Sequence, residues 1–383
     1  MLGEPYRLFF PLGIVLTWVA VAPWLGFAMG IVAAPPILSH ALLQVQGFLT
    51  CFVIGFLWTA VPKRTGTAPA RGWQVVGAAV LAVASAAFLL ADRRSDAQAC
   101  WLLLMALTTW FVMARFRRRR ALRSPPRSFL WLPVGFACAF LGAGVIGAYA
   151  GLGEEWFSLH DLGRGLILQG MMFSFVVGVG GMLLPLITRG EVAPDMTRAD
   201  WPKALAHGAA ALLLIGSFVV ETWYSPRLAH GLRAALAAVL LITEAKIHRR
   251  PTVAGAHRLV VQASAWAIPL GYGWAAAQPQ FVSAALHVVL LGGFGTMALA
   301  VGLHVVLSHG GATGQVHGRP WPVLAMAGGL ALALGARVAA VLDAAHYVPW
   351  LALAAAAFLL ATLCWAWLAL PWIVRVGPSL AAR

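Results

Sequence analysis

The stretch YVPWLALAAAAFLLATLCWAWLALPWIV, residues 347–374, decides the fold class because it contains no Asp, Glu, Lys or Arg. A helix that crosses the hydrocarbon core of a bilayer needs about 20 consecutive, mostly apolar residues. Comparable runs, bounded by charge, Pro or Gly as helix ends should be, lie at 8–31, 37–62, 72–91, 98–115, 129–151, 162–187, 202–220, 228–247, 258–276, 281–308 and 321–342. The alternation of ~10-residue β-barrel strands is missing. The sequence therefore predicts about twelve transmembrane helices.

The composition leads to the same fold class. Of the 383 residues, 61% are hydrophobic and 10% are Asp, Glu, Lys or Arg, and the mean hydropathy is +0.84. A soluble domain carries roughly 25% charged residues, so a water-soluble protein is excluded. We expect an all-α integral membrane protein with one polytopic membrane domain, residues 1–383.

The basic residues predict the orientation of the chain. The net charge is +15, and the arginine run 117–120 and most other Lys and Arg fall in alternate loops, beginning with residues 63–71. Lys and Arg mark the cytoplasmic side of a membrane protein, so both termini are predicted to be cytoplasmic. The basic loops are then expected to contact anionic lipid in the bilayer, and no nucleic acid is expected as a partner.

Three of the predicted helices share a spacing pattern. His40 is followed by Gly55 and Pro62, His287 by Gly302 and His309, and Gly163 by Gly178 and Pro185, at the same two intervals. These intervals follow one face of an α-helix. Because the three helices are the second, sixth and tenth, the pattern predicts three pseudo-repeats of four helices, at about 1–127, 128–257 and 258–383.

The few ionisable residues inside the predicted helices are the main clue to function, since burying a charge in a bilayer is costly. His40 and His287 lie at similar depth near the outer ends of their helices, on equivalent faces, and could hold a planar tetrapyrrole as axial ligands. Gln44, Gly47 and Gly295 lie on the same faces. Haem propionates need cationic partners, and the arginines at that depth are Arg164, Arg233 and Arg337. A membrane histidine can equally donate an interhelical hydrogen bond, and both interpretations remain open.

Other histidines lie toward the cytoplasmic side. His304 and His309 are five residues apart and on different faces of one helix, which makes them a poor pair for a single metal ion. They are weaker metal candidates than the outer pair, and the pattern favours interhelical hydrogen bonds for them. His248, His257 and His317 fall in or beside predicted loops and are expected to be solvated.

Three segments of the sequence resemble the NnrS family. They are PYRLFF at 5–10, GFLWTAVPKRTG at 55–66 and HVVLLGGFGTMALAVGLHVVLSHGG at 287–311. The family consists of twelve-helix membrane proteins that bind haem and copper and are linked to nitric oxide and nitrosative stress. The resemblance implies a multi-pass protein of the bacterial inner membrane that contains haem b, and it leaves open whether copper binds as well. His40, His287 and His309 stand where the family has the same residue.

The sequence departs from the family pattern at several positions. The family commonly has His-x-His-Glu-Met at the start of the second helix, where this chain has His40-Ala41-Leu42-Leu43-Gln44. The family usually has Arg at the positions of His304 and Ala312. If the missing His and Glu bind copper or move protons in the family, this chain lacks that ability.

The predicted layout also looks like the catalytic subunit of haem-copper oxidases. That family has twelve helices in three arcs, with a low-spin haem held by histidines of the second and tenth helices and arginines of the eleventh on its propionates. His40, His287 and Arg337 match these roles by position only. The oxidase copper ligands have no counterpart at residues 163–169, so a reductase of oxygen or nitric oxide is not expected.

The leading hypothesis from the sequence is a b-type haem protein with one bis-histidyl haem near the periplasmic face. It would serve electron transfer, redox sensing or nitric oxide handling, with a redox partner or a larger membrane complex. The alternative is a haem-free transporter or a structural subunit of a larger complex. A proton-coupled transporter needs a carboxylate in its pathway, and the nearest candidates, including Glu221 and Asp343, lie at helix ends.

Overall fold

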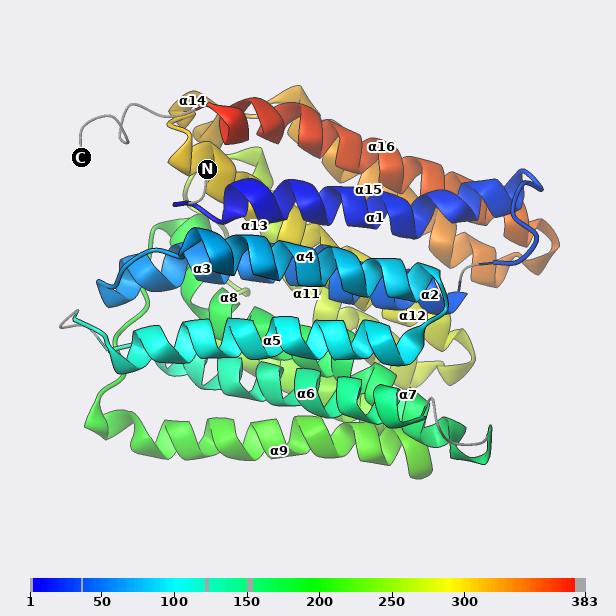
Figure 1. Cartoon of the computed structure of the whole chain (residues 1–383), viewed down its shortest axis with the longest axis horizontal. Helices are drawn as coiled ribbons and strands as arrows, with labels where there is room; N and C mark the ends of the chain where they lie inside the picture. The colour runs from blue at the N-terminus through cyan, green and yellow to red at the C-terminus, as the bar shows by residue number, and fades with distance from the viewer. Residues whose placement is uncertain (1–2, 36, 121–123, 150–153, 376–383) are drawn as a thin grey trace.

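The computed structural model describes residues 3–35, 37–120, 124–149 and 154–375, which form helices and no strand (Figure 1). Eleven helical segments in this part of the chain are long and apolar enough to cross a membrane. They are Tyr6–Ala28 (α1), Ser39–Thr65, Gly72–Leu90 (α4), Arg94–Arg117 (α5), Arg127–Tyr149, Phe157–Arg189, Arg198–Trp223, Pro226–Thr243 (α10), Pro279–His309, Trp321–Leu342 (α15) and Ala344–Val374. A twelfth helix, α11 (Ala256–Ala277), runs alongside them. The predicted all-α integral membrane fold is therefore confirmed.

The three spans with the shared sequence pattern also share an unusual backbone. Each consists of an α-helix, a π-helical segment and a second α-helix, and among the described residues these are the only π-helical segments. The bounds are α2 (Ile37–Leu42), η1 (Leu43–Leu49) and α3 (Thr50–Thr65); α7 (Phe157–Gly165), η4 (Leu166–Met171) and α8 (Met172–Arg189); and α12 (Val282–His287), η7 (Val288–Gly295) and α13 (Thr296–His309). This common irregularity supports the predicted threefold duplication.

Local sequence explains parts of this backbone. In a π-helix the backbone hydrogen bonds join residues five apart. The hydroxyls of Thr50 and Thr296, each directly after a π-segment, donate to the carbonyls of Val45 at 2.7 Å and Leu291 at 2.8 Å, also five residues back. These bonds give π-segment carbonyls an additional donor.

Each of the three π-containing spans ends close to a glycine in the left-handed conformation. Gly66 (φ 64°), Gly190 (φ 71°) and Gly311 (φ 75°) adopt the left-handed conformation at or just beyond the ends of α3, α8 and α13. Glycine favours this conformation because it has no Cβ. The three glycines therefore stop the spans at corresponding places in the proposed repeats.

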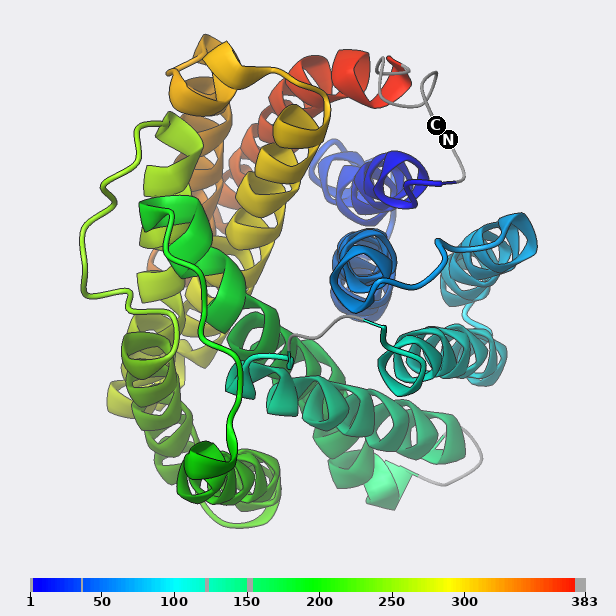
Figure 2. The same ribbon diagram turned by 90° about the vertical axis from the view of Figure 1, so that its left-hand side faces the viewer.

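The three π-containing spans lie innermost in the bundle. Viewed from the end that holds the start of α1 and the end of α16 (Tyr347–Val374), the blue α3, green α8 and gold α13 surround the centre (Figure 2). Each packs against the helix that precedes it, α1, α6 (Trp131–Tyr149) or α11. The remaining helices, among them α9 (Trp201–Trp223), complete the outer ring. The centre is thus lined by the three spans that share the sequence pattern and the π-helical backbone.

Glycines allow the inner helices to approach their neighbours. A Cβ on Gly55 would lie 2.8 Å from Phe10 of α1, and one on Gly178 would lie 3.3 Å from Leu132 of α6. A Cβ on Gly302 would lie 2.6 Å from Phe52 of α3. The repeated glycine of the sequence pattern is therefore a helix-contact position, which is the usual role of small residues in membrane helices.

The segments that carry the family resemblance meet at one end of the bundle. Glu4 forms ion pairs with Arg7 at 2.9 Å, Lys63 at 3.3 Å and His309 at 3.4 Å. Arg7 also donates to the carbonyls of Ile373 at 2.5 Å and Arg375 at 2.8 Å. This cluster, which we call the terminal clasp, joins the start of α1 to the ends of α3, α13 and α16.

Candidate functional site

His40 occupies the last turn of α2, directly before a π-segment. Its Nδ1 lies 3.1 Å from the carbonyl oxygen of Ala20 on α1, and its ring meets Trp24 edge-on at a centroid distance of 5.7 Å. A carbonyl only accepts, so Nδ1 carries the proton and Nε2 keeps a free lone pair. The ring of His40 is thus oriented by α1 with its Nε2 available as a ligand.

His287 has the matching arrangement in the third repeat. It ends α12 directly before η7, and its Nδ1 lies 2.7 Å from the carbonyl oxygen of Ser283. Because this carbonyl can only accept, Nδ1 of His287 carries the proton and its Nε2 keeps the lone pair. Histidine ligands to metals commonly donate their second ring nitrogen to a carbonyl in this way, which fixes the tautomer and the ring orientation.

Arg337 of α15 belongs to the same cluster. Its Nη2 donates to Ser283 Oγ at 3.1 Å, while its Nη1 is buried and has no hydrogen-bond partner among the described residues. Ser283 links Arg337 to His287, because its carbonyl accepts from His287 Nδ1. His40 lies in α2, and α2 and α12 lie at the same end of the bundle (Figure 1). The structure therefore places Arg337 beside His287, with His40 at the same end of the bundle.

Arg233 lies in a different polar cluster, in the second repeat. Its fully buried guanidinium donates to Glu221 Oε2 at 2.5 Å, Gln169 Oε1 at 2.9 Å and Ser217 Oγ at 2.8 Å. Arg164 pairs with Asp161 at 3.6 Å. Both arginines already have protein carboxylates as partners, unlike Arg337 Nη1.

Gln44 and Gly47 lie on the same side of their span as His40. Gln44 Oε1 accepts from Thr17 Oγ1 at 2.8 Å, and a Cβ on Gly47 would lie 3.3 Å from Leu16, so both residues face α1, as His40 does. The space beside Gly47 is therefore filled by Leu16. A Cβ on Gly295 would lie 3.2 Å from the carbonyl oxygen of Leu290 and 4.0 Å from Phe48.

The histidines at the opposite end contact side chains of other segments. His257 Nε2 lies 3.0 Å from His304 Nδ1, and His257 is only 1% exposed. The expectation that His257 is solvated is wrong, because α11 begins at Ala256 and places this residue in its first turn, against α13. His309 pairs with Glu4 in the terminal clasp and packs edge-on against Tyr6 at 5.4 Å.

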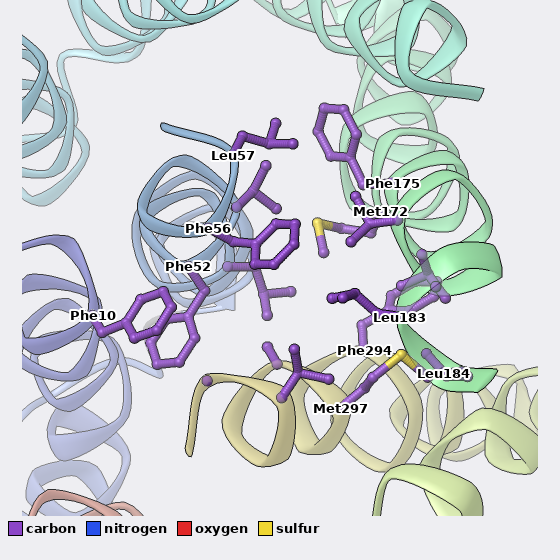
Figure 3. A pocket seen from close by; sticks show the side chains of 18 residues that line it. Phe10, Phe52, Phe56, Leu57, Met172, Phe175, Leu183, Leu184, Phe294 and Met297 are labelled. Carbon is purple, nitrogen blue, oxygen red and sulfur yellow. The ribbon is translucent and has the colours of Figure 1, made fainter. Parts of the chain in front are cut away.

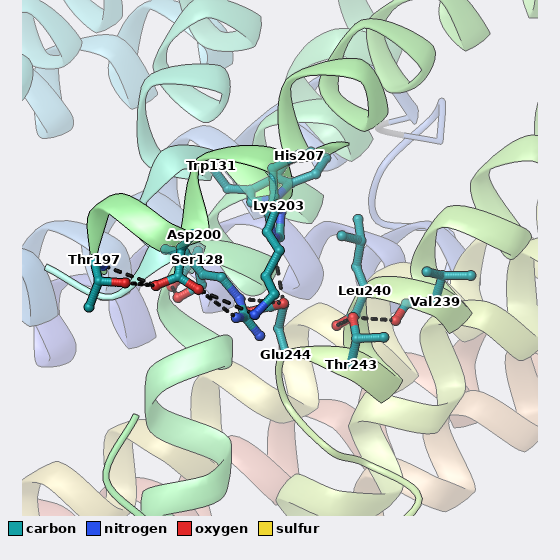
Figure 4. A network of polar contacts seen from close by, with 12 residues as sticks. Ser128, Trp131, Thr197, Asp200, Lys203, His207, Val239, Leu240, Thr243 and Glu244 are labelled. Atoms are coloured by element: carbon teal, nitrogen blue, oxygen red, sulfur yellow. Dashed lines mark hydrogen bonds and ion pairs between the residues drawn. The ribbon is translucent and has the colours of Figure 1, made fainter. Parts of the chain in front are cut away.

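A further buried network joins α6, α9 and the end of α10 (Figure 4). Trp131 Nε1 donates to His207 Nδ1 at 2.8 Å, and His207 Nε2 lies 3.5 Å from Glu244, which also accepts from Arg127 at 3.0 Å. Burial raises the pKa of Glu244, but the bonds from His207 and Arg127 outweigh it and leave the pKa below its usual value. All donors here have acceptors, which is typical of a structural network.

Within the described ranges, no three His, Cys, Asp or Glu side chains come together to hold a metal ion. The cluster of His40, His287 and Arg337 instead offers two imidazole nitrogens and a cation, a donor set that suits a group bringing its own metal and anionic substituents. Fold and site together define a multi-pass helical membrane protein with a histidine pair near one end of its inner helices.

The chain belongs to the NnrS family, because the family model described as NnrS protein matches residues 1–376, essentially the whole chain. Membership supports a membrane protein related to nitric oxide or stress and linked in general terms to haem and metal binding. No curated protein matches the sequence significantly. The resemblance that the sequence predicted is confirmed.

Proposed function

We propose that this protein is a b-type haem protein of the bacterial inner membrane in which His40 and His287 ligate the iron. The observation that carries the proposal is the shared tautomer of the two rings. Each Nδ1 donates to a backbone carbonyl, of Ala20 or Ser283, so that both Nε2 atoms are left as ligands. The alternative is that the histidines only donate interhelical hydrogen bonds. It would account for the bond from His40 Nδ1 to Ala20 of α1, but the bond from His287 Nδ1 to Ser283 stays within one helix.

Arg337 would pair with a propionate of the haem. Its Nη1 is buried without a partner in the described part of the chain, and an unpaired buried donor is costly. Ser283 holds Nη2 of the same guanidinium at 3.1 Å, so that one serine links the arginine to the turn that ends in His287. A bound carboxylate would satisfy the remaining donor.

A bound haem would supply a one-electron redox change at a fixed position in the membrane. The residues of this chain would orient it through His40, His287 and Arg337. Two protein ligands leave no vacant position on the iron, so we place the function in electron transfer, redox sensing or nitric oxide handling rather than in catalysis at an open metal site.

The test is the haem content of purified protein expressed with ample haem supply. Wild-type protein is expected to carry about one haem per chain, and His40→Ala and His287→Ala are expected to lose most of it. His317→Ala is the matched control, since this exposed histidine also bonds through Nδ1 to a carbonyl, that of Thr313.

A second variant separates ligand loss from misfolding. In His287→Gly, imidazole added to the buffer is expected to restore haem binding, because it replaces the missing ring. A haem-free wild-type protein, or single variants with unchanged haem content and spectrum, would overturn the proposal and favour a haem-free transporter or subunit.

A further inference from the structure

An apolar cavity of about 90 Å³ lies at the centre of the bundle. Figure 3 shows its lining side chains, which come from α3, α8 and α13, from the adjoining π-segments η1 and η7, and from Phe10 of α1. The cavity begins near Leu49 and Phe294, beyond His40 and His287 on the same two spans, and extends toward the end that holds both termini. It is therefore separate from the histidine pair.

The lining contains no polar side chain. Every lining residue is Phe, Leu, Val, Met, Ala or Gly. A cavity of this chemistry does not bind ions, and engineered apolar cavities of about 150 Å³ stay dry while they bind benzene or xenon. An ion or a charged solute is therefore excluded as the occupant.

The cavity arises where the three inner helices face one another. Val53, Val176, Ala298 and Val301 are only partly buried although they belong to the innermost helices. Protein interiors are normally close-packed, and larger side chains at positions such as Ala298 would fill the space. The small residues Gly180 and Ala298 are part of its lining.

We propose that this central cavity binds small uncharged gas molecules of diatomic size, including nitric oxide. The volume accommodates a diatomic molecule or a xenon atom. An uncharged gas needs no polar partner and partitions from water into apolar surroundings. The proposal does not depend on haem binding, because no lining residue belongs to the histidine cluster.

Xenon is the probe, because it binds apolar cavities and scatters anomalously. Crystals of the full-length protein pressurised with xenon are expected to show an anomalous peak between α3, α8 and α13. No peak at this position, or density for a lipid chain in it, would overturn the proposal.

Two substitutions make the test specific. Ala298→Phe is expected to abolish the central xenon peak, and Leu183→Ala, which enlarges the cavity, is expected to increase its occupancy. Ala209→Phe, which adds the same volume on an exposed position of α9, is the matched control and should leave the peak unchanged. A peak that persists in Ala298→Phe would contradict the assignment.

A competition experiment tests the class of ligand. Crystals equilibrated with nitric oxide before xenon are expected to show a lower xenon occupancy at the centre than crystals equilibrated with nitrogen at the same pressure. Equal occupancy in the two treatments would overturn the assignment to diatomic gases. Neither result depends on the haem content of the protein, so this proposal and the haem proposal fail separately.

Discussion

At the scale of single residues, the two candidate ligands are distinguished by what holds them. Within the membrane-spanning helices, His40 and His287 bond through Nδ1 to backbone carbonyls, whereas His207, His257, His304 and His309 contact side chains. The exposed His317, outside these helices, also bonds through Nδ1 to a carbonyl. The depth of His40 and His287 in their helices could be predicted from the sequence. The direction of their ring nitrogens could not, because it depends on the positions of Ala20 and Ser283.

Arg337 gives a prediction at this scale. If its guanidinium pairs with a propionate, Arg337→Gln should retain haem but lower its midpoint potential, because a nearby cation favours the reduced iron. An interaction of about 1.4 kcal/mol corresponds to about 60 mV for one electron. Redox titration measures the shift. Arg227→Gln, at an exposed position of α10, should not change the potential, and an unchanged potential in Arg337→Gln would contradict the pairing.

Glu4 gives a prediction about pH. The hydrogen bond with His309, followed by those with Arg7 and Lys63, holds the pKa of Glu4 well below its usual range in spite of burial. A lowered folded-state pKa stabilises the protein above the unfolded value of about 4.3, and the contribution is lost as the pH falls through the folded-state pKa. Because Glu4 is partly exposed, we expect Glu4→Gln to cost about 1 kcal/mol at pH 7.

Thermal unfolding in detergent checks this expectation. The difference between wild type and Glu4→Gln should be largest at neutral pH and should narrow as the pH falls below about 4. Glu155→Gln, at an exposed position, serves as the control. A difference that is the same at every pH would show that the Glu4 carboxylate charge does not stabilise the terminal clasp.

At the scale of elements, the π-segments mark the limit of prediction from the sequence. The apolar spans agree with the helices within a few residues, as 258–276 does with Ala256–Ala277. The sequence shows the shared spacing of the second, sixth and tenth spans but not their π-helical backbone, because a local change of helix type leaves no clear signal in hydrophobic periodicity.

The π-segment of the tenth span supports a deletion experiment. Removing Leu291 shortens η7 by one residue and should let it relax to α-helix, which changes the position of His287 relative to α13. We expect the deletion variant to insert in the membrane but to lose haem. Leu291→Ala, which keeps the length of the segment, should retain it. Full haem content in the deletion variant would argue that the register of η7 does not position His287.

At the scale of the whole molecule, three spans with the same irregular backbone surround one centre. The repeat was visible in the sequence only as widely spaced His, Gly and Pro residues, and the shared π-segments and glycine ends strengthen it. The central cavity could not be predicted, since its lining residues come from three units far apart in the chain. The distribution of basic loops, in contrast, already predicts the orientation.

Reporter fusions test that orientation. The start of α1 and the end of α16 lie together and are joined by the hydrogen bond from Arg7 to the carbonyl of Ile373. Green fluorescent protein fused after Arg383 should fluoresce, because it folds in the cytoplasm. The same protein fused after Tyr224 should stay dark, while alkaline phosphatase at that point should be active. The reverse pattern would invert the topology and place the histidine pair at the cytoplasmic face.

The central claim is that two histidines hold one haem between the first and third repeats. The most direct measurement is the electron paramagnetic resonance spectrum of the oxidised, purified protein. We predict the signal of a low-spin, six-coordinate ferric haem, lost in His287→Gly together with most of the haem and restored when that variant is supplied with haem and imidazole. A wild-type protein without a haem signal, or with a high-spin signal that His287→Gly leaves unchanged, would contradict the account.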